Sequence, residues 1–165
     1  MRSALRAEVP AGAERLWDVV RRELPDADDE TVYVVGSIAG LLVAIAYADR
    51  RYAAEEETRV RRELERVHGM TAAGIDAICA VLREHVVEVS TVQAPRYSRL
   101  LLELCDRELR VEVLGTLVEL AAADGVIDTA EVNMLRLMTT SLGLSQDDYN
   151  AAQAKHRERI KILGR

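Results

Sequence analysis

The sequence predicts an all-α protein: a single compact domain made of two related helical halves around two central apolar helices. Three observations predict this class. Apolar residues recur at helical spacing along most of the chain, one long segment is uncharged and apolar on every side, and a pattern of the first half returns in the second. With 165 residues, of which 49% are hydrophobic, the chain can bury one aliphatic core.

The first two helices are marked by prolines and by acidic residues. An amino-terminal helix is predicted within residues 10–24, because its apolar residues share one face and Pro10 and Pro25 delimit it. The next helix is the uncharged segment 31–48, which follows acidic residues that suit the amino end of a helix dipole. A segment of this length is either a core helix or a membrane span. We favour the core helix, because the flanks are charged and Ala and Gly outweigh Leu and Phe.

Stops and caps place the remaining helices. Gly69 ends a third helix, and Thr71 caps a fourth that extends through Leu82. Residues 86–95 are rich in β-branched side chains but form too short and isolated a segment for a strand, so we predict a connector there. Further helices are predicted over residues 96–105, 107–124, 128–142 and 145–160.

The two halves repeat one pattern. Residues 41–49, LLVAIAYAD, align with residues 116–124, TLVELAAAD. Seven residues after each Asp comes a Glu, which is Glu56 in the first half and Glu131 in the second. A shift of one residue would make Glu57 the equivalent instead.

Neither half has enough apolar surface to fold alone, so we expect the two central helices to pack against each other. Small residues on the first of them would let the helices approach closely: Gly36, Ala39 and Gly40. The related halves extend over about 30–85 and 105–160. Together with an amino-terminal helix within residues 1–25, they form one domain over residues 1–165.

The second half contains an acidic turn, ADGVIDTAE (residues 123–131), that has two explanations. In the first, Gly125 ends one helix, Asp128 caps the next and Glu131 completes a capping box. In the second, Asp124, Asp128 and Glu131 bind a cation that relieves their mutual repulsion. Oxygen ligands without His or Cys favour Ca²⁺ or Mg²⁺ over Zn²⁺. An EF-hand is excluded, because apolar residues stand where the first ligands of its loop belong.

The A-x-A-D-G-x-I-D-x-x-E turn, its partner YADRRYAAEEE in the first half and the G-L-S helix restart resemble the TerB-like, tellurite-resistance-associated family. That family also includes the amino-terminal domain of the DnaJ-like co-chaperone DjlA. The resemblance covers residues from about 30 to 160. It implies an all-α domain of seven to nine helices in a bacterial protein linked to tellurite and other stress. It also implies metal binding at the acidic turns, and the matching positions are Asp124, Asp128, Glu131, Asp49 and Glu56.

The first turn departs from the family pattern. Arg50 stands in place of the Gly, and Ala53 stands in place of the second acid. We expect Arg50 to neutralise Asp49 directly, which makes the second turn the better metal site.

Composition and motifs limit the function. The formal charge of −6 argues against nucleic-acid binding. The start of the chain lacks the apolar segment of a signal peptide, and Cys79 and Cys105 are far apart, so we expect a cytoplasmic protein with reduced thiols. The sequence has no phosphate-binding loop, nucleophile elbow or Ser/His/Asp grouping. The lone E-x-x-H motif at Glu65–His68 lacks the second copy that a di-iron bundle requires.

We therefore predict a protein that is not an enzyme. It is a stress-associated scaffold or binding module that meets an unidentified protein partner, free in the cytoplasm or in a complex near the membrane, with a divalent-metal input at the second acidic turn. The alternative is a metal-dependent enzyme or metal carrier that uses carboxylates of both turns. The basic tail KHRERIKILGR is either the exposed side of the last helix or a docking patch for an acidic partner or a membrane surface.

Overall fold

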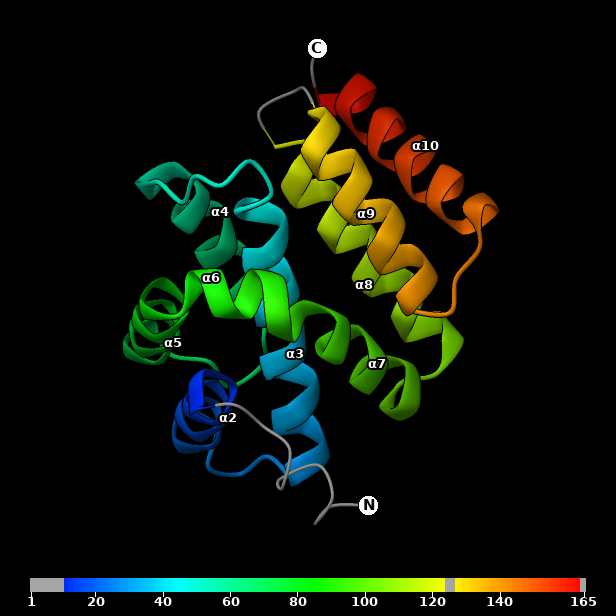
Figure 1. Cartoon of the computed structure of the whole chain (residues 1–165). Coiled ribbons are helices and arrows are strands. Elements are labelled where there is room, and N and C mark those ends of the chain that lie inside the picture. The colour runs from blue at the N-terminus through cyan, green and yellow to red at the C-terminus, as the bar shows by residue number, and fades with distance from the viewer. Residues whose placement is uncertain (1–10, 124–126, 164–165) are drawn as a thin grey trace.

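The computed structural model describes residues 11–123 and 127–163. Within these residues the chain forms helices and no strand, in one compact domain, which confirms the predicted all-α class (Figure 1). In chain order the elements are α2 (Ala11–Glu23), α3 (Asp29–Ala46), α4 (Ala54–Leu64), α5 (Ala72–Glu84), α6 (Val86–Glu88), the π-helix η1 (Val89–Gln93), α7 (Ala94–Leu104), α8 (Arg107–Ala121), α9 (Thr129–Ser141) and α10 (Gln146–Leu163).

Helix α3 forms the centre of the molecule. Asp28 caps its amino end, because its carboxylate accepts a 2.7 Å hydrogen bond from the backbone N–H of Thr31. Its side chains are buried on nearly every face, as a helix that is apolar all round requires. The helix is long and apolar enough to cross a membrane, but 67% of that segment is buried inside the protein. The burial supports the core-helix interpretation.

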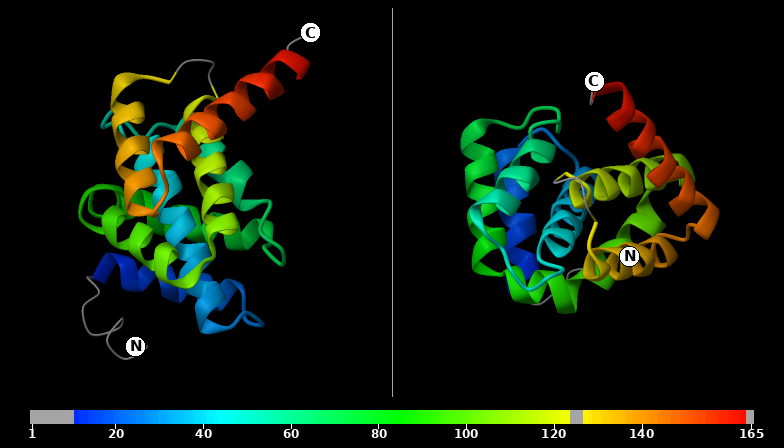
Figure 2. Two further views of the ribbon diagram at one scale, coloured as in Figure 1. Left: turned by 90° about the vertical axis from the view of Figure 1, so that its right-hand side faces the viewer. Right: turned by 90° about the horizontal axis from the view of Figure 1, so that it is seen from above.

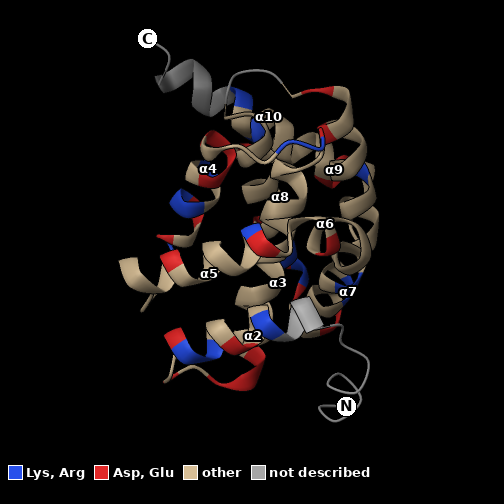
Figure 3. Cartoon of the chain, turned by 60° about the vertical axis from the view of Figure 1, so that its left-hand side comes forward, with Lys and Arg blue, Asp and Glu red and all other residues tan. Residues whose placement is uncertain are grey.

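The other helices surround α3 on two sides. Helices α2, α4 and α5 lie on one side of it, and α8, α9 and α10 lie on the other, with α6, η1 and α7 crossing between them (Figure 1). The carboxyl end of α10 extends beyond the neighbouring helices (Figure 2). Charged residues lie mainly on the outer helices, and α3 carries none from residue 31 to its end (Figure 3).

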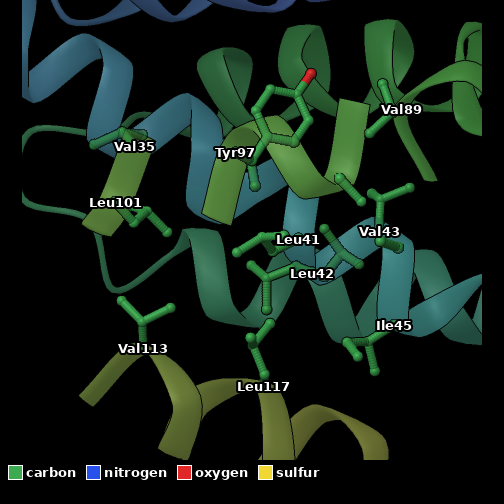
Figure 4. Close-up of a cluster of buried hydrophobic side chains, with 14 of the residues drawn as sticks. Val35, Leu41, Leu42, Val43, Ile45, Val89, Tyr97, Leu101, Val113 and Leu117 are labelled. Carbon is green, nitrogen blue, oxygen red and sulfur yellow. The ribbon is translucent and has the colours of Figure 1, made fainter. Parts of the chain in front are cut away.

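Aliphatic side chains from α3, α7 and α8 meet in the core (Figure 4). Leu41 and Leu42 of α3 face Leu117 of α8, and all three are buried. The central helices of the two halves therefore pack against each other, as predicted.

The glycines of α3 serve other contacts than the predicted one. A Cβ atom at Gly36 would lie 2.7 Å from Cδ1 of Trp17 in α2, and one at Gly40 would lie 2.3 Å from Cε2 of Tyr97 in α7. Each glycine thus makes room for an aromatic ring. The prediction that these glycines bring the two central helices together is wrong, because they lie on the faces of α3 that receive α2 and α7.

Residues 86–95, predicted as a connector, are helical instead. Their β-branched side chains favour a strand in isolation, but burial of Val89 and Gln93 against α3 overrides that preference. The wider π turn lies just before Pro95, which has no N–H and cannot donate to the carbonyl four residues earlier. The π turn is the local solution that keeps the helix continuous there.

Candidate functional site

The second acidic turn forms the capping box that its spacing predicts. At the start of α9, Oδ1 of Asp128 accepts a 2.8 Å hydrogen bond from the backbone N–H of Glu131. In return, Oε1 of Glu131 accepts one of 3.2 Å from the backbone N–H of Asp128. The two carboxylates thus satisfy N–H groups that have no partner inside the helix. Asp124, the third carboxylate of the prediction, lies outside the described residues.

The first acidic turn makes only part of this arrangement. Oε2 of Glu56 accepts a 2.9 Å hydrogen bond from the backbone N–H of Ala53, but the methyl side chain of Ala53 cannot accept one in return. Oδ1 of Asp49 accepts a 3.0 Å bond from the backbone N–H of Arg51, rather than from the side chain of Arg50. Arg50 has a φ angle of 68°, in the left-handed region that glycine adopts readily and that other residues adopt only with strain.

The two turns meet at one small pocket, although they are far apart in the sequence. The pocket has a volume of about 50 Å³ and an apolar floor from α3 and α8. In Figure 3 the segment between α3 and α4, which contains the first acidic turn and its two arginines (blue), lies beside the acidic amino end of α9 (red). This agrees with the two turns lining one pocket. The lining residues are Ile45, Ala46, Asp49, Glu56, Arg59, Leu120, Asp128 and Glu131.

Four of the five predicted metal ligands therefore line one pocket, and the fifth, Asp124, is not described. Within the described residues no three acidic, His or Cys side chains stand close enough together to hold a metal ion. Each of the four carboxylates accepts a hydrogen bond from a backbone N–H of its own turn. The pocket has room for a few water molecules.

Glu57, the alternative equivalent of Glu131, has a different role. Its Oε1 accepts hydrogen bonds of 3.0 and 2.7 Å from Nε and Nη2 of Arg83, which ties α4 to α5. The bond from Ala53 goes to Glu56, so the structure pairs Glu56 with Glu131. Beside this ion pair, burial raises the pKa of the Cys79 thiol to about 11, which keeps the thiol protonated and unreactive at neutral pH.

A larger groove of about 480 Å³ lies between α8 and α10. Its floor includes Gly115 and Ala152, and a Cβ atom at Gly115 would meet nothing within 4 Å. Charged side chains of both signs line it, among them Glu112 and Lys155. Its volume suits a small molecule, but this mixture of charges favours no single class of ligand.

Two pocket-lining residues, Arg59 and Gly115, belong to none of the motifs of the sequence. Arg59 follows Glu56 by three positions, a spacing that places both side chains on one face of α4 and could have drawn attention to it. A glycine inside a helix such as α8 usually has a packing or functional reason.

The fold and the site define a class of protein: an all-α domain in which two acidic turns, one from each half, meet at a single pocket. A family model described as "Tellurite resistance protein TerB" matches residues 36–154, which is more than half of the chain and includes both turns. The chain belongs to the TerB family. No curated protein and no solved structure gives a significant match. The relationship to the amino-terminal domain of DjlA stays a prediction.

Proposed function

We propose that this chain is a non-enzymatic binding module of a tellurite-type stress response in the cytoplasm, with a divalent cation as its input and a protein partner as its output. Membership of the TerB family supports the link to tellurite resistance. The observation that carries the cation input is the meeting of four carboxylates from two distant turns at one pocket.

The size and chemistry of the pocket favour an ion over an organic substrate. Its volume of about 50 Å³ is well below the roughly 300 Å³ at which small-molecule sites begin. Its four acidic lining residues offer carboxylate oxygens, and hard cations such as Ca²⁺ and Mg²⁺ prefer oxygen ligands. Zn²⁺ is less suited, because the pocket has no His or Cys among its described lining residues.

A second candidate follows from the same geometry. Because carboxylates of both turns line the pocket, a metal-dependent enzyme or metal carrier could draw its ligands from both halves. Such a site needs the four side chains to leave their backbone partners and turn toward one ion. A cation bound to the binding module requires the same movement of the carboxylates. An enzyme would also have to place a substrate beside the ion, so we favour the binding module.

Thermal unfolding of the full chain tests the cation input. We would compare EDTA with Ca²⁺, Mg²⁺, Mn²⁺ and Zn²⁺, using Glu131→Gln as the pocket variant and Glu103→Gln, an exposed carboxylate on α7, as the control. An ion at a hundred times its dissociation constant should stabilise the fold by about 2.7 kcal/mol, or several degrees. Glu131→Gln should lose this gain and Glu103→Gln should keep it. If no ion shifts the melting temperature of the unchanged chain, the cation input is refuted.

Complementation tests the link to stress. A bacterial strain that lacks this chain should become sensitive to tellurite and should recover with the unchanged gene. If growth on tellurite does not depend on the chain, the proposed role in tellurite stress is refuted, whatever the result of the cation experiment.

A further inference from the structure

The groove between α8 and α10 has the size of a small-molecule site. Its volume of about 480 Å³ lies within the roughly 300 to 1,000 Å³ that such sites occupy. The two helices begin side by side, where Arg107 of α8 forms an ion pair with Asp148 of α10. Beyond this pair the small residues Gly115, Ala151 and Ala152 line the space between them, so a hollow opens there. The described residues that line it are distinct from those of the acidic pocket.

Most charged side chains of the groove already have a partner. Arg66 forms an ion pair with Glu119, with 3.6 Å between Nη1 and Oε2, and Asp148 is held by the ion pair at the start of the helices. Glu112 of α8 and Lys155 of α10 differ, because neither side chain has an ion-pair or hydrogen-bond partner in the described part of the chain. The full set of charges favours no class of ligand, but the two that lack a partner are one of each sign.

Glu112 and Lys155 lie at similar heights on the two walls of the groove. Both helices run in the same direction from the pair of Arg107 and Asp148 (Figure 1). Glu112 is five residues beyond Arg107 and Lys155 is seven residues beyond Asp148, which at a rise of 1.5 Å per residue corresponds to about 7.5 and about 10.5 Å. The two charges therefore lie within about one helical turn of the same level, on opposite sides of the groove.

His156 adds a hydrogen-bonding group that is not satisfied. It follows Lys155 on α10 and lines the groove. Both of its ring nitrogens are buried, and neither has a hydrogen-bond partner in the described part of the chain. Buried polar groups are nearly always hydrogen-bonded, because leaving one without a partner destabilises the protein. This imidazole indicates a ligand independently of the two charges.

We propose that the groove between α8 and α10 binds a small zwitterion, a free amino acid or a dipeptide. Lys155 and His156 hold its carboxylate, because an ammonium group and an imidazole N–H both donate to carboxylate oxygens. Glu112 holds its ammonium group from the opposite wall. The small residues of the floor leave room for its side chains. The site is separate from the proposed cation input and does not depend on it.

Isothermal titration calorimetry of the full chain with three related peptides tests the zwitterion. The peptides are alanylalanine, its N-acetylated form, which lacks the ammonium group, and its C-terminal amide, which lacks the carboxylate. We expect alanylalanine to bind at least about tenfold more tightly than either blocked form, a ratio that corresponds to about 1.4 kcal/mol.

Two charge variants assign each end of the peptide to its wall. Glu112→Gln should bind alanylalanine and the acetylated form equally, and Lys155→Met should bind alanylalanine and the amide equally. Glu108→Gln is the control, because Glu108 is exposed on α8 and does not line the groove, and it should keep both preferences. A general loss of stability would weaken all three peptides alike and would not remove one preference alone.

A variant that fills the groove checks where the peptide binds. Gly115→Leu places a side chain in the open space of the groove and should abolish binding. Ala154→Leu adds the same side chain at an exposed position of α10 outside the groove and should leave binding unchanged. A melting curve establishes that each variant is folded. If Gly115→Leu does not fold, the two charge variants, which change exposed side chains, still decide the matter.

The outcomes leave the proposal standing or overturn it. It stands if each blocked end weakens binding and each charge variant removes the matching preference. Absence of binding to the unchanged chain overturns it, as does equal binding of all three peptides. Sensitivity to one blocked end alone overturns the zwitterion, and binding that survives Gly115→Leu overturns the location. None of these results bears on the cation input, which the melting experiment with metal ions tests by itself.

Discussion

In the second half of the protein, the helix after the acidic turn starts with two reciprocal hydrogen bonds between Asp128 and Glu131, whereas the first half makes only one of the pair. Ala53 stands at the capping position there and offers no side-chain acceptor, yet α4 begins at the same point of the turn. The glutamate is the part that both halves keep, and both Glu56 and Glu131 line the pocket. The helix therefore begins at this position even without a capping acid, and the glutamate that both halves share lines the pocket in each case.

The central helices of the two halves differ as well. In α3, Gly40 lies against the ring of Tyr97, so that its missing side chain is filled by a neighbour. In α8, Gly115 faces open space in the groove next to α10. One glycine serves packing inside the molecule, and the other leaves a hollow at its surface.

The largest effect is expected from exchanging these glycines for alanine. Gly40→Ala would force a Cβ atom to within 2.3 Å of the buried Tyr97 ring, and such overpacking typically costs about 1 to 3 kcal/mol. Gly115→Ala should instead stabilise the protein by up to about 1 kcal/mol, because alanine is the better helix former and meets no neighbour. Urea unfolding measures both. Equal stability of the two variants would refute the contrast between the two helices.

The next effect concerns the caps. Asp128→Ala should cost about 0.5 to 2 kcal/mol, the usual loss when a capping side chain is removed. Ala53→Asp should stabilise the protein by a similar or smaller free energy, since it supplies the side-chain acceptor that the first half lacks. Asp128→Asn is the control, because asparagine caps as well as aspartate but carries no charge. A large loss with Asp128→Asn would assign the role of Asp128 to its charge rather than to its hydrogen bond.

Features of the fold that depend on neighbouring residues could be predicted from the sequence. Asp128 and Glu131 are three positions apart, so their capping box needs only the turn between them. Gly69 is predicted to end a helix and Gly143 begins the G-L-S restart, and both glycines have positive φ angles, 85° and 70°. The contact of Gly40 with Tyr97 could not be predicted in this way, because it depends on where α7 crosses α3.

The pocket combines both kinds of information. The repeated Asp and Glu positions indicated that the two turns are related. Their meeting depends on how α4 and α9 pack against α3, which no local pattern encodes. The same reason hides the position of Arg59 in the lining of the pocket, since a charged residue on an amphipathic helix normally faces water. The helical state of η1 was missed because β-branched residues carry a strand preference that burial against α3 overrides.

A smaller effect is expected at Arg50. The left-handed conformation costs a residue with a side chain about 1 to 2 kcal/mol. Glycine avoids this cost, but it loses more conformational freedom on folding, which cancels part of the gain. Arg50→Gly should therefore stabilise the protein by about 0.5 to 1 kcal/mol. It retains the 2.8 Å hydrogen bond from the backbone N–H of residue 50 to the carbonyl of Tyr47. Arg51→Gly is the matched control, because Arg51 has no positive φ angle and its replacement should bring no gain. Equal effects of both changes would show that strain at Arg50 is not the cause.

The smallest effect distinguishes the two helix restarts by their response to pH. In the first half Thr71 accepts a 3.0 Å bond from the backbone N–H of Gly74, and no carboxylate takes part. In the second half Asp148 accepts a 2.8 Å bond from the backbone N–H of Ser145. That bond, aided by the Ser145 hydroxyl and by Arg107, lowers the pKa of Asp148 below its ordinary value.

A carboxylate whose pKa is lower in the folded protein than in the unfolded chain stabilises the fold above its unfolded pKa. This contribution is lost as the pH falls through the lowered pKa, in a window below about pH 4. Asp148→Asn should therefore flatten the pH dependence of unfolding in that window, whereas Asp147→Asn, a neighbouring exposed carboxylate, should leave it steeper. Urea unfolding between about pH 2 and 7 measures the slope. Identical slopes for the two variants would mean that the second restart gains no stability from the charge of Asp148, and that both halves restart their helices through neutral hydrogen bonds alone.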